Sequence, residues 1–127
     1  FIKKMIRVLK KNNIKISLFI EPLIPHVALA KKINADSIEL HTGKFCRLFN
    51  CKKNYKRELM KIKKAANFAK KIGLNVHAGH GLTYKSIKKV CSINSITEYN
   101  IGHYIIAQSI FTGLPYSIKK FKKIINR

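Results

Sequence analysis

The stretch "GLNVHAGHGLTYKSIKK", residues 73–89, carries the pattern that decides the fold. A short apolar run is followed by a turn rich in glycine and histidine, and then by a lysine-studded amphipathic segment. This order predicts a strand, a tight turn and a helix. Glycine lets main-chain N–H groups approach a ligand, and the start of a helix offers unpaired N–H groups to an anion. The turn therefore predicts either a phosphate-handling site beside a titratable group, or only a tight strand-to-helix connection.

The same unit repeats along the rest of the chain. Short apolar, mostly β-branched runs predict strands at residues 14–20, 35–40, 74–78 and 96–101. Segments with helical spacing follow them at 23–33, 55–72, 83–91 and 103–113, with a last helix near 115–125. Strands that alternate with helices favour right-handed crossovers and a parallel sheet covered by helices.

Two closures of such a sheet are possible. A doubly wound sheet is disfavoured, because its strands are usually longer and its first turn usually reads GxGxxG. A (β/α)₈ barrel collects polar residues at the carboxyl ends of its strands, as this chain does after each of its last three predicted strands. We therefore predict an α/β fold of the TIM (β/α)₈ barrel type. Residues 1–127 would form roughly the last four βα units, a fragment that is the C-terminal half of one barrel domain.

The predicted strand ends supply the candidate site. Glu39 and His41 lie two residues apart in "SIELHTG", so on an extended strand their side chains point the same way. A carboxylate inside a strand is costly without a function or a partner, and a structural ion pair is the alternative to a catalytic role. "EYNIGH" ends the next strand with Gly102 and His103 at a helix start, which repeats the arrangement of Gly79, His80 and Gly81.

The charge is the most prominent feature of the composition. A formal charge of +22, from 27 Lys and Arg against 5 Asp and Glu, is typical of proteins that bind nucleic acid or acidic membranes. Only four of the basic residues are arginines, and the lysines recur at outer helical positions such as Lys61, Lys64 and Lys71. Specific nucleic-acid readers concentrate arginine and stacking aromatic residues on one face. Specific nucleic-acid binding is therefore disfavoured, whereas weak nonspecific binding of polyanions is expected.

Other patterns predict a protein of the reducing cytoplasm without a metal site. The three cysteines, Cys46, Cys51 and Cys91, form neither a CxxC pair nor an even set for disulfides. The sequence has no signal-peptide pattern and no apolar run near the ~20 residues that span a bilayer. His77 and His80 form HxxH, but their side chains should diverge where the strand enters the turn, so we predict no metal ligand there.

Several motifs, taken in order and with their spacing, match one known family. "ISLFI" followed by an acid, "IELHTG", "HAGHGLTY", and "NIGH" with a downstream "TGL" resemble the C-terminal half of the pyridoxine 5′-phosphate synthase family. The resemblance runs from about Ile14 to the end of the chain. The pair "AGHGLTY" and "NIGH" carries most of its specificity.

The resemblance implies a function and a role for each site residue. The family condenses 1-deoxy-D-xylulose 5-phosphate with 3-amino-2-oxopropyl phosphate, giving pyridoxine 5′-phosphate, phosphate and water without a redox cofactor. By motif, His80 corresponds to the catalytic proton donor and Glu39 to the carboxylate that stabilises the transition state. Gly81, Gly102 and His103 correspond to substrate-binding residues, and two phosphorylated substrates fit glycine-rich turns at strand ends. Repeated proton transfers suit a histidine that titrates near neutrality.

The resemblance also sets limits and alternatives. The family's other acid–base residues and much of its deoxyxylulose-phosphate site lie on earlier strands, which this chain does not contain. The family usually assembles into symmetric homo-oligomers. Two rival functions remain open at this point, a basic nucleic-acid-binding module and an inactive half-barrel that needs a partner.

Overall fold

A parallel sheet is the centre of the molecule in a computed structural model that describes residues 1–126. Its strands are β1 (Ser17–Ile20), β2 (Ser37–His41), β3 (Asn75–Gly79) and β4 (Glu98–Asn100). They pair in the order β1-β2-β3-β4, and every pairing is parallel. The α/β fold predicted from the alternating pattern is therefore confirmed.

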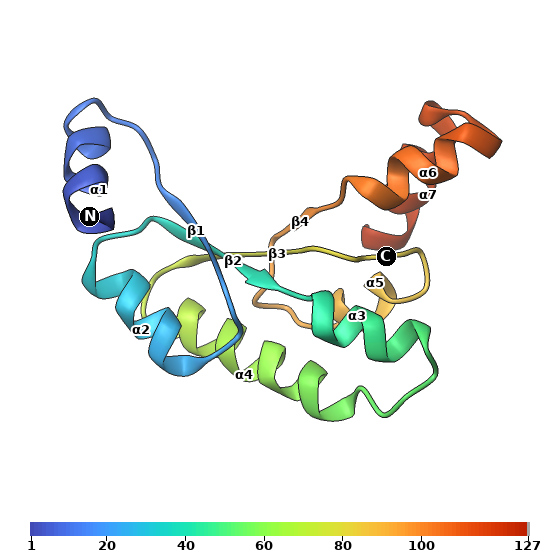
Figure 1. The fold of residues 1–127 in the computed structure, drawn as a ribbon, viewed down its shortest axis with the longest axis horizontal. Helices are drawn as coiled ribbons and strands as arrows, with labels where there is room; N and C mark the ends of the chain where they lie inside the picture. Colours follow the sequence, from blue (N-terminus) through green and yellow to red (C-terminus); the bar gives the residue numbers. More distant parts are fainter. Residues whose placement is uncertain (127) are drawn as a thin grey trace.

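The helices connect the strands and follow the last one. They are α1 (Ile2–Lys11), α2 (Ile24–Lys32), α3 (Gly43–Asn50), α4 (Lys56–Lys71), α5 (Ile87–Val90), α6 (His103–Thr112) and α7 (Leu114–Ile125). Figure 1 shows α2 and α4 along one side of the sheet, while α1 and the α6–α7 pair stand at its two ends.

The structure differs from the predicted pattern in two places. Helix α3 lies between β2 and α4, where the sequence pattern indicated a single helix at 55–72. It packs through Phe45 and Cys46, which are buried in the core. The helix predicted at 83–91 is only the short α5, because Thr83 and Ser86 exchange side-chain and backbone hydrogen bonds in a turn before it.

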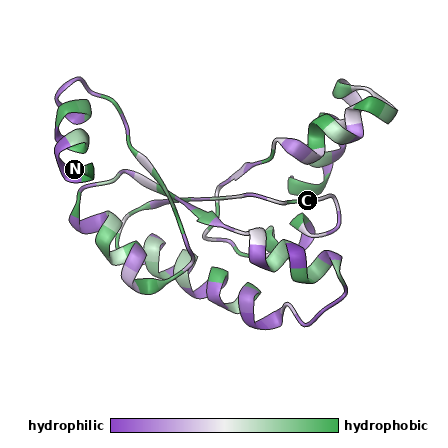
Figure 2. Cartoon of the chain, in the orientation of Figure 1, coloured by the Kyte–Doolittle hydropathy of each residue, from purple (hydrophilic) through white to green (hydrophobic). Residues whose placement is uncertain are grey.

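One face of the sheet forms the core. Ile38, Leu40, Val76 and Ala78 are at most 1% exposed and pack with the apolar sides of α2 and α4. Figure 2 shows the corresponding mixture of hydrophobic and hydrophilic residues along α4. This burial follows from the alternation of side chains along a strand.

The opposite face of the sheet carries a different set of side chains. Phe19, Glu39, His77 and Glu98 are paired across the four strands, so they form one row on this face. Phe19 is 56% exposed, and His77 Nδ1 lies 3.5 Å from Glu98 Oε1. Parallel sheets are normally covered on both faces. The residues described here cover one of them.

Asp36 ties α1 to the amino-terminal end of the sheet. Lys10 Nζ donates to Asp36 Oδ1 at 2.8 Å, and the backbone N–H of Ile16 donates to Oδ2 at 2.8 Å. The Lys10 bond first, and then the Ile16 bond, hold the pKa of the Asp36 carboxyl below its usual range. Asp36 is therefore a structural carboxylate.

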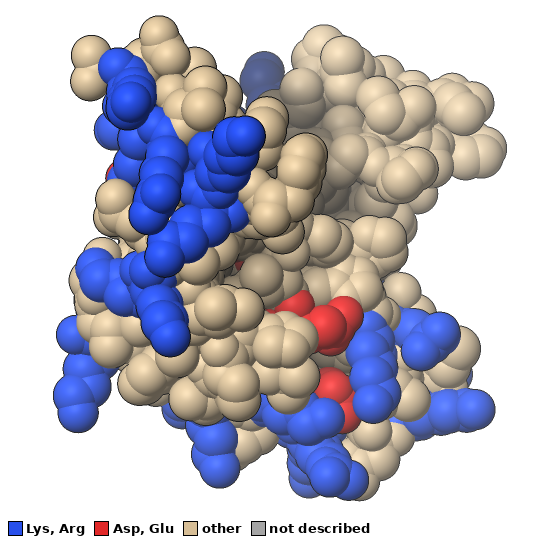
Figure 3. All heavy atoms as spheres, turned by 60° about the vertical axis from the view of Figure 1, so that its left-hand side comes forward, with Lys and Arg blue, Asp and Glu red and all other residues tan. Residues whose placement is uncertain are grey.

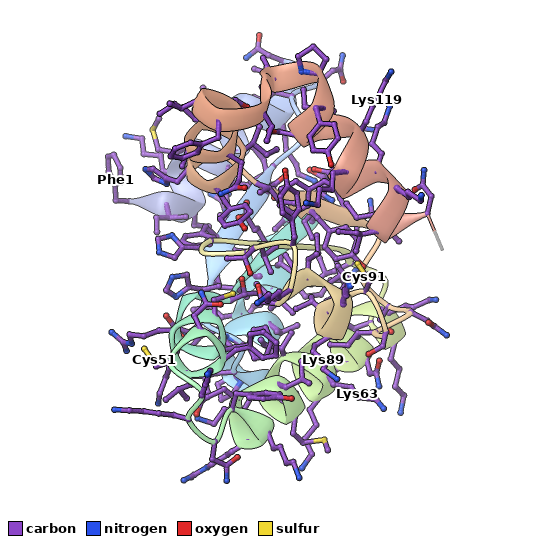
Figure 4. The ribbon with its side chains drawn as sticks, turned by 90° about the vertical axis from the view of Figure 1, so that its right-hand side faces the viewer. Phe1, Cys51, Lys63, Lys89, Cys91 and Lys119 are labelled. Atoms are coloured by element: carbon purple, nitrogen blue, oxygen red, sulfur yellow. The ribbon has the colours of Figure 1, made fainter. Side chains whose placement is uncertain are left out.

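The cysteines are free thiols in separate places. Figure 4 shows Cys51 and Cys91 on different sides of the molecule, and Cys46 is buried. Burial raises the pKa of the Cys46 thiol, which disfavours the reactive thiolate. Within residues 1–126, no helix combines the length and the apolar character that crossing a membrane requires.

Candidate active site

The carboxyl ends of the strands surround a pocket of about 620 Å³. Its lining includes all five residues that the sequence singled out: Glu39, His80, Gly81, Gly102 and His103. These residues come from three strand ends, because parallel strands place their carboxyl ends at one edge of the sheet. The pocket also includes Phe19, Asn100 and Tyr104, which sequence reasoning did not select.

Glu39 projects from β2 into this pocket and is half-buried. Its Oε2 accepts a hydrogen bond from Asn100 Nδ2 at 2.6 Å. Among residues 1–126, no Lys, Arg or His lies within salt-bridge distance of its carboxylate, so the structural ion pair considered above is not observed. A Cβ on Gly79 would collide with the Glu39 carboxylate, so glycine at position 79 provides the space for it. Within residues 1–126, the second carboxylate oxygen, Oε1, has no hydrogen-bond donor from the protein.

His80 has an unusual backbone conformation. Its φ is +78°, in the left-handed region that non-glycine residues rarely adopt. The fully buried Thr42 holds this turn, because its Oγ1 lies 2.8 Å from the carbonyl oxygen of Gly79 and 2.7 Å from that of His80. Backbone conformations of this kind persist where the surroundings impose them, often at functional sites. The turn presents an exposed imidazole at the mouth of the pocket.

Gly102 and His103 form the other side of the pocket, at the start of α6. Gly102 is the residue that precedes the helix, and its carbonyl accepts the N–H of Ile106 at 3.2 Å. None of the described side chains caps this end of the helix, so its first N–H groups are available to an anion. A Cβ on Gly102 would meet no protein atom within 4 Å, because the residue faces open space. The predicted helix start at His103 is confirmed.

His41 pairs with a carboxylate from another strand end, and not with Glu39 on its own strand. Its Nδ1 lies 2.8 Å from Oε1 of Glu21, the residue that follows β1. The His41 ring also packs on His80, with 4.6 Å between ring centroids, and on Phe19, at 5.1 Å. The pairing with Glu21 gave no signal in the sequence, because the two residues are 20 positions apart.

Metal ligation receives no support from the described part of the chain. Within residues 1–126, no group of three His, Cys, Asp or Glu side chains is arranged to hold a metal ion. His77 lies beside Glu98, and His80 lies beside His41. The polar groups of the pocket include one carboxylate, two imidazoles, the Asn100 carboxamide, the Tyr104 hydroxyl and backbone N–H groups, a set that suits proton transfer and anion binding.

A parallel sheet with a pocket at its strand ends, lined by acid–base side chains and a helix start, defines the chain as an α/β protein. The family model described as "Pyridoxal phosphate biosynthesis protein PdxJ" matches residues 1–127, and the chain belongs to this family.

Relatives with assigned names agree with this membership. The pyridoxine 5′-phosphate synthase of Pelagibacter ubique (strain HTCC1062) is 46% identical over 126 residues, which cover 99% of this chain and 53% of that protein. The pyridoxine 5′-phosphate synthase of Sulfurihydrogenibium sp. (strain YO3AOP1) is 44% identical over 125 residues, covering 98% of this chain and 51% of that protein. The chain therefore spans about half the length of the curated relatives it matches.

Proposed function

We propose that residues 1–127 are the C-terminal half of a single (β/α)₈ barrel domain. The parallel order β1-β2-β3-β4, helices on one face and a row of side chains on the other support this proposal. Strands β1 and β4 each have one edge without a partner strand in the described chain. The missing half would pair with both edges and cover the open face.

The half-barrel proposal predicts that the isolated chain is self-associated or incompletely folded. A 127-residue polypeptide should self-associate or show weak protection of its strand amides, because two strand edges and an apolar residue such as Phe19 remain exposed. Sedimentation velocity and amide hydrogen exchange would measure this. A cooperative monomer with fully protected β1 and β4 would contradict the proposal.

We further propose that the complete protein is a pyridoxine 5′-phosphate synthase. It would condense 1-deoxy-D-xylulose 5-phosphate with 3-amino-2-oxopropyl phosphate, releasing phosphate and water. The observation that carries this proposal is the pocket that brings Glu39, His80 and the Gly102–His103 helix start together. Membership in the family and the names of the relatives support the same activity.

Each pocket residue has a role that its geometry supports. His80 would donate a proton to the departing oxygen, since an exposed imidazole at the pocket mouth can reach a substrate and exchange protons with water. Glu39 would stabilise positive charge that develops on the substrate nitrogen, with its carboxylate oriented by Asn100. Gly81, Gly102 and His103 would bind the substrate phosphate through backbone N–H groups and the imidazole. None of these steps transfers electrons to a redox cofactor.

The rival functions receive less support. In Figure 3, lysine and arginine side chains cover much of the left-hand half and the lower edge of the face shown, a distribution that suits weak nonspecific binding of polyanions. Membership in a family of biosynthetic enzymes favours the enzyme over a dedicated nucleic-acid module. We also propose that the complete protein forms a homo-oligomer in the cytoplasm.

Turnover of the complete protein tests the proposed function. The full-length protein should form pyridoxine 5′-phosphate from the two phosphorylated substrates, and the 127-residue chain alone should not, because the resemblance to the family implies that the first half of the barrel would supply further catalytic groups. Chromatography of the product together with a phosphate-release assay would follow the reaction. The proposed synthase activity would be refuted by a folded full-length protein that binds nucleic acid tightly and forms no product.

A further inference from the structure

We infer that Glu21 and His41 form a positioning pair for the His80 imidazole, an inference that rests on the proposed function. Glu21 follows β1 and His41 ends β2, and Glu21 Oε1 lies 2.8 Å from His41 Nδ1. His41 in turn contacts His80 edge to face, with ring centroids 4.6 Å apart and an angle of 64° between the rings. The three side chains thus form a continuous line from the strand β1 to the proposed proton donor.

The carboxylate fixes the state and orientation of His41. An ionised carboxylate only accepts hydrogen bonds, so the proton of the His41–Glu21 bond lies on Nδ1. The hydrogen bond that one imidazole nitrogen makes decides which form of the ring is present. In the neutral ring, Nε2 is therefore without a proton and faces the region of Gly43 and His80.

The rings of His41 and His80 are packed with little free space. A Cβ on Gly43 would lie 2.7 Å from His80 Cδ2 and 2.8 Å from His41 Nε2. Phe19 contacts His41 as well, with 5.1 Å between ring centroids. His41 is therefore held by Glu21, Phe19 and Gly43, and it limits the rotamers that His80 can adopt.

This restraint matters because His80 is exposed to solvent. An exposed side chain normally samples several staggered rotamers, and only one of them would point its donor at a substrate in the pocket. A general acid must come within hydrogen-bond reach of the atom it protonates. The pair should consequently affect the chemical step, while phosphate binding at Gly81, Gly102 and His103 does not depend on it.

The test compares variants of the full-length protein. Glu21→Ala should lower kcat by about 10-fold or more and leave KM within ~2-fold, because misplacing a reacting group weakens chemistry more than binding. Glu21→Gln keeps an oxygen acceptor for the Nδ1–H of His41, so it should restore most of kcat. Glu21 is more than half exposed, so both variants should fold.

A spectroscopic measurement separates positioning from a general loss of structure. In protein labelled with ¹⁵N-histidine at alkaline pH, the ring-nitrogen shifts of His41 should report the Nδ1–H form in the wild type and in Glu21→Gln. In Glu21→Ala the Nε2–H form, which free neutral imidazole prefers, should replace it. This readout needs no turnover, so it tests the pairing even if the wild-type protein lacks the proposed activity.

Two further variants act as matched controls. Gly43→Ala places a methyl group against the His41 and His80 rings and leaves Glu21 unchanged. It should lower kcat as Glu21→Ala does, while His41 keeps its hydrogen bond to Glu21. Asp36→Ala removes a structural carboxylate at the other end of the sheet, so it should reduce stability without changing the ring form of His41 or the kcat of folded protein. An unchanged Nδ1–H signal in Glu21→Ala, or equal kcat in Glu21→Ala and the wild type, would overturn the inference.

Discussion

Replacing His80 by alanine in the full-length protein is expected to lower kcat by about 10²-fold or more, the usual cost of losing a general acid. The affinity for phosphorylated ligands should change little, because Gly102 and His103 provide the phosphate contacts in our proposal. The loss should therefore fall on kcat and kcat/KM together. Steady-state kinetics with both substrates, and a separate binding titration with pyridoxine 5′-phosphate, would measure the two effects.

The structure favours a local effect of this substitution. The His80 side chain is exposed, and Thr42 contacts the backbone at this position and not the imidazole. His26 provides a matched control, because it is an exposed histidine on α2 outside the pocket, and His26→Ala should keep wild-type turnover. Wild-type kcat in His80→Ala would remove His80 from the mechanism and leave the glycine-rich turn a purely structural connection.

Replacing Gly102 by valine is expected to weaken strongly the binding of pyridoxine 5′-phosphate at high salt. At ~0.5 M salt the Debye length is roughly 4 Å, so diffuse attraction by the +22 charge is screened, whereas backbone N–H donors at the start of α6 act locally. A side chain at position 102 would extend into the open space where the ligand must approach. We expect at least ~10-fold weaker binding by isothermal titration calorimetry, which corresponds to about 1.4 kcal/mol.

The controls for this substitution separate the pocket from the overall charge. The Gly102 Cβ would contact no protein atom, so the variant should keep the circular dichroism spectrum and the Tm of the wild type. Lys63 and Lys89 are exposed on α4 and α5 and are not among the residues that line the pocket, and Figure 4 shows them near each other, so Lys63→Gln and Lys89→Gln should retain salt-resistant binding. Lys61 is a poorer control because it pairs with Glu58 at 2.9 Å. If the lysine variants lose binding and Gly102→Val keeps it, the phosphate site lies elsewhere.

The sequence alone determined the strands, most of the helices and the candidate site residues. Apolar runs and helical spacing are local signals, and they predicted all four strands and a parallel sheet. The motifs that resemble the family then selected, from the residues at the strand ends, Glu39, His80, Gly81, Gly102 and His103, which all line one pocket. The strand and sheet predictions succeeded because each strand signal depends on residues that are close together in the chain.

Only the tertiary structure decided how the site residues are held. The Glu39–Asn100 bond joins residues 61 positions apart, the Glu21–His41 bond joins residues 20 apart, and Thr42 reaches the turn at His80 across 38 positions. The left-handed φ of His80 likewise had no local signal, because its neighbours are the usual glycines of such a turn. These contacts depend on the register of parallel strands, which is fixed by the packing of the whole sheet against its helices and is not encoded by any short stretch of sequence.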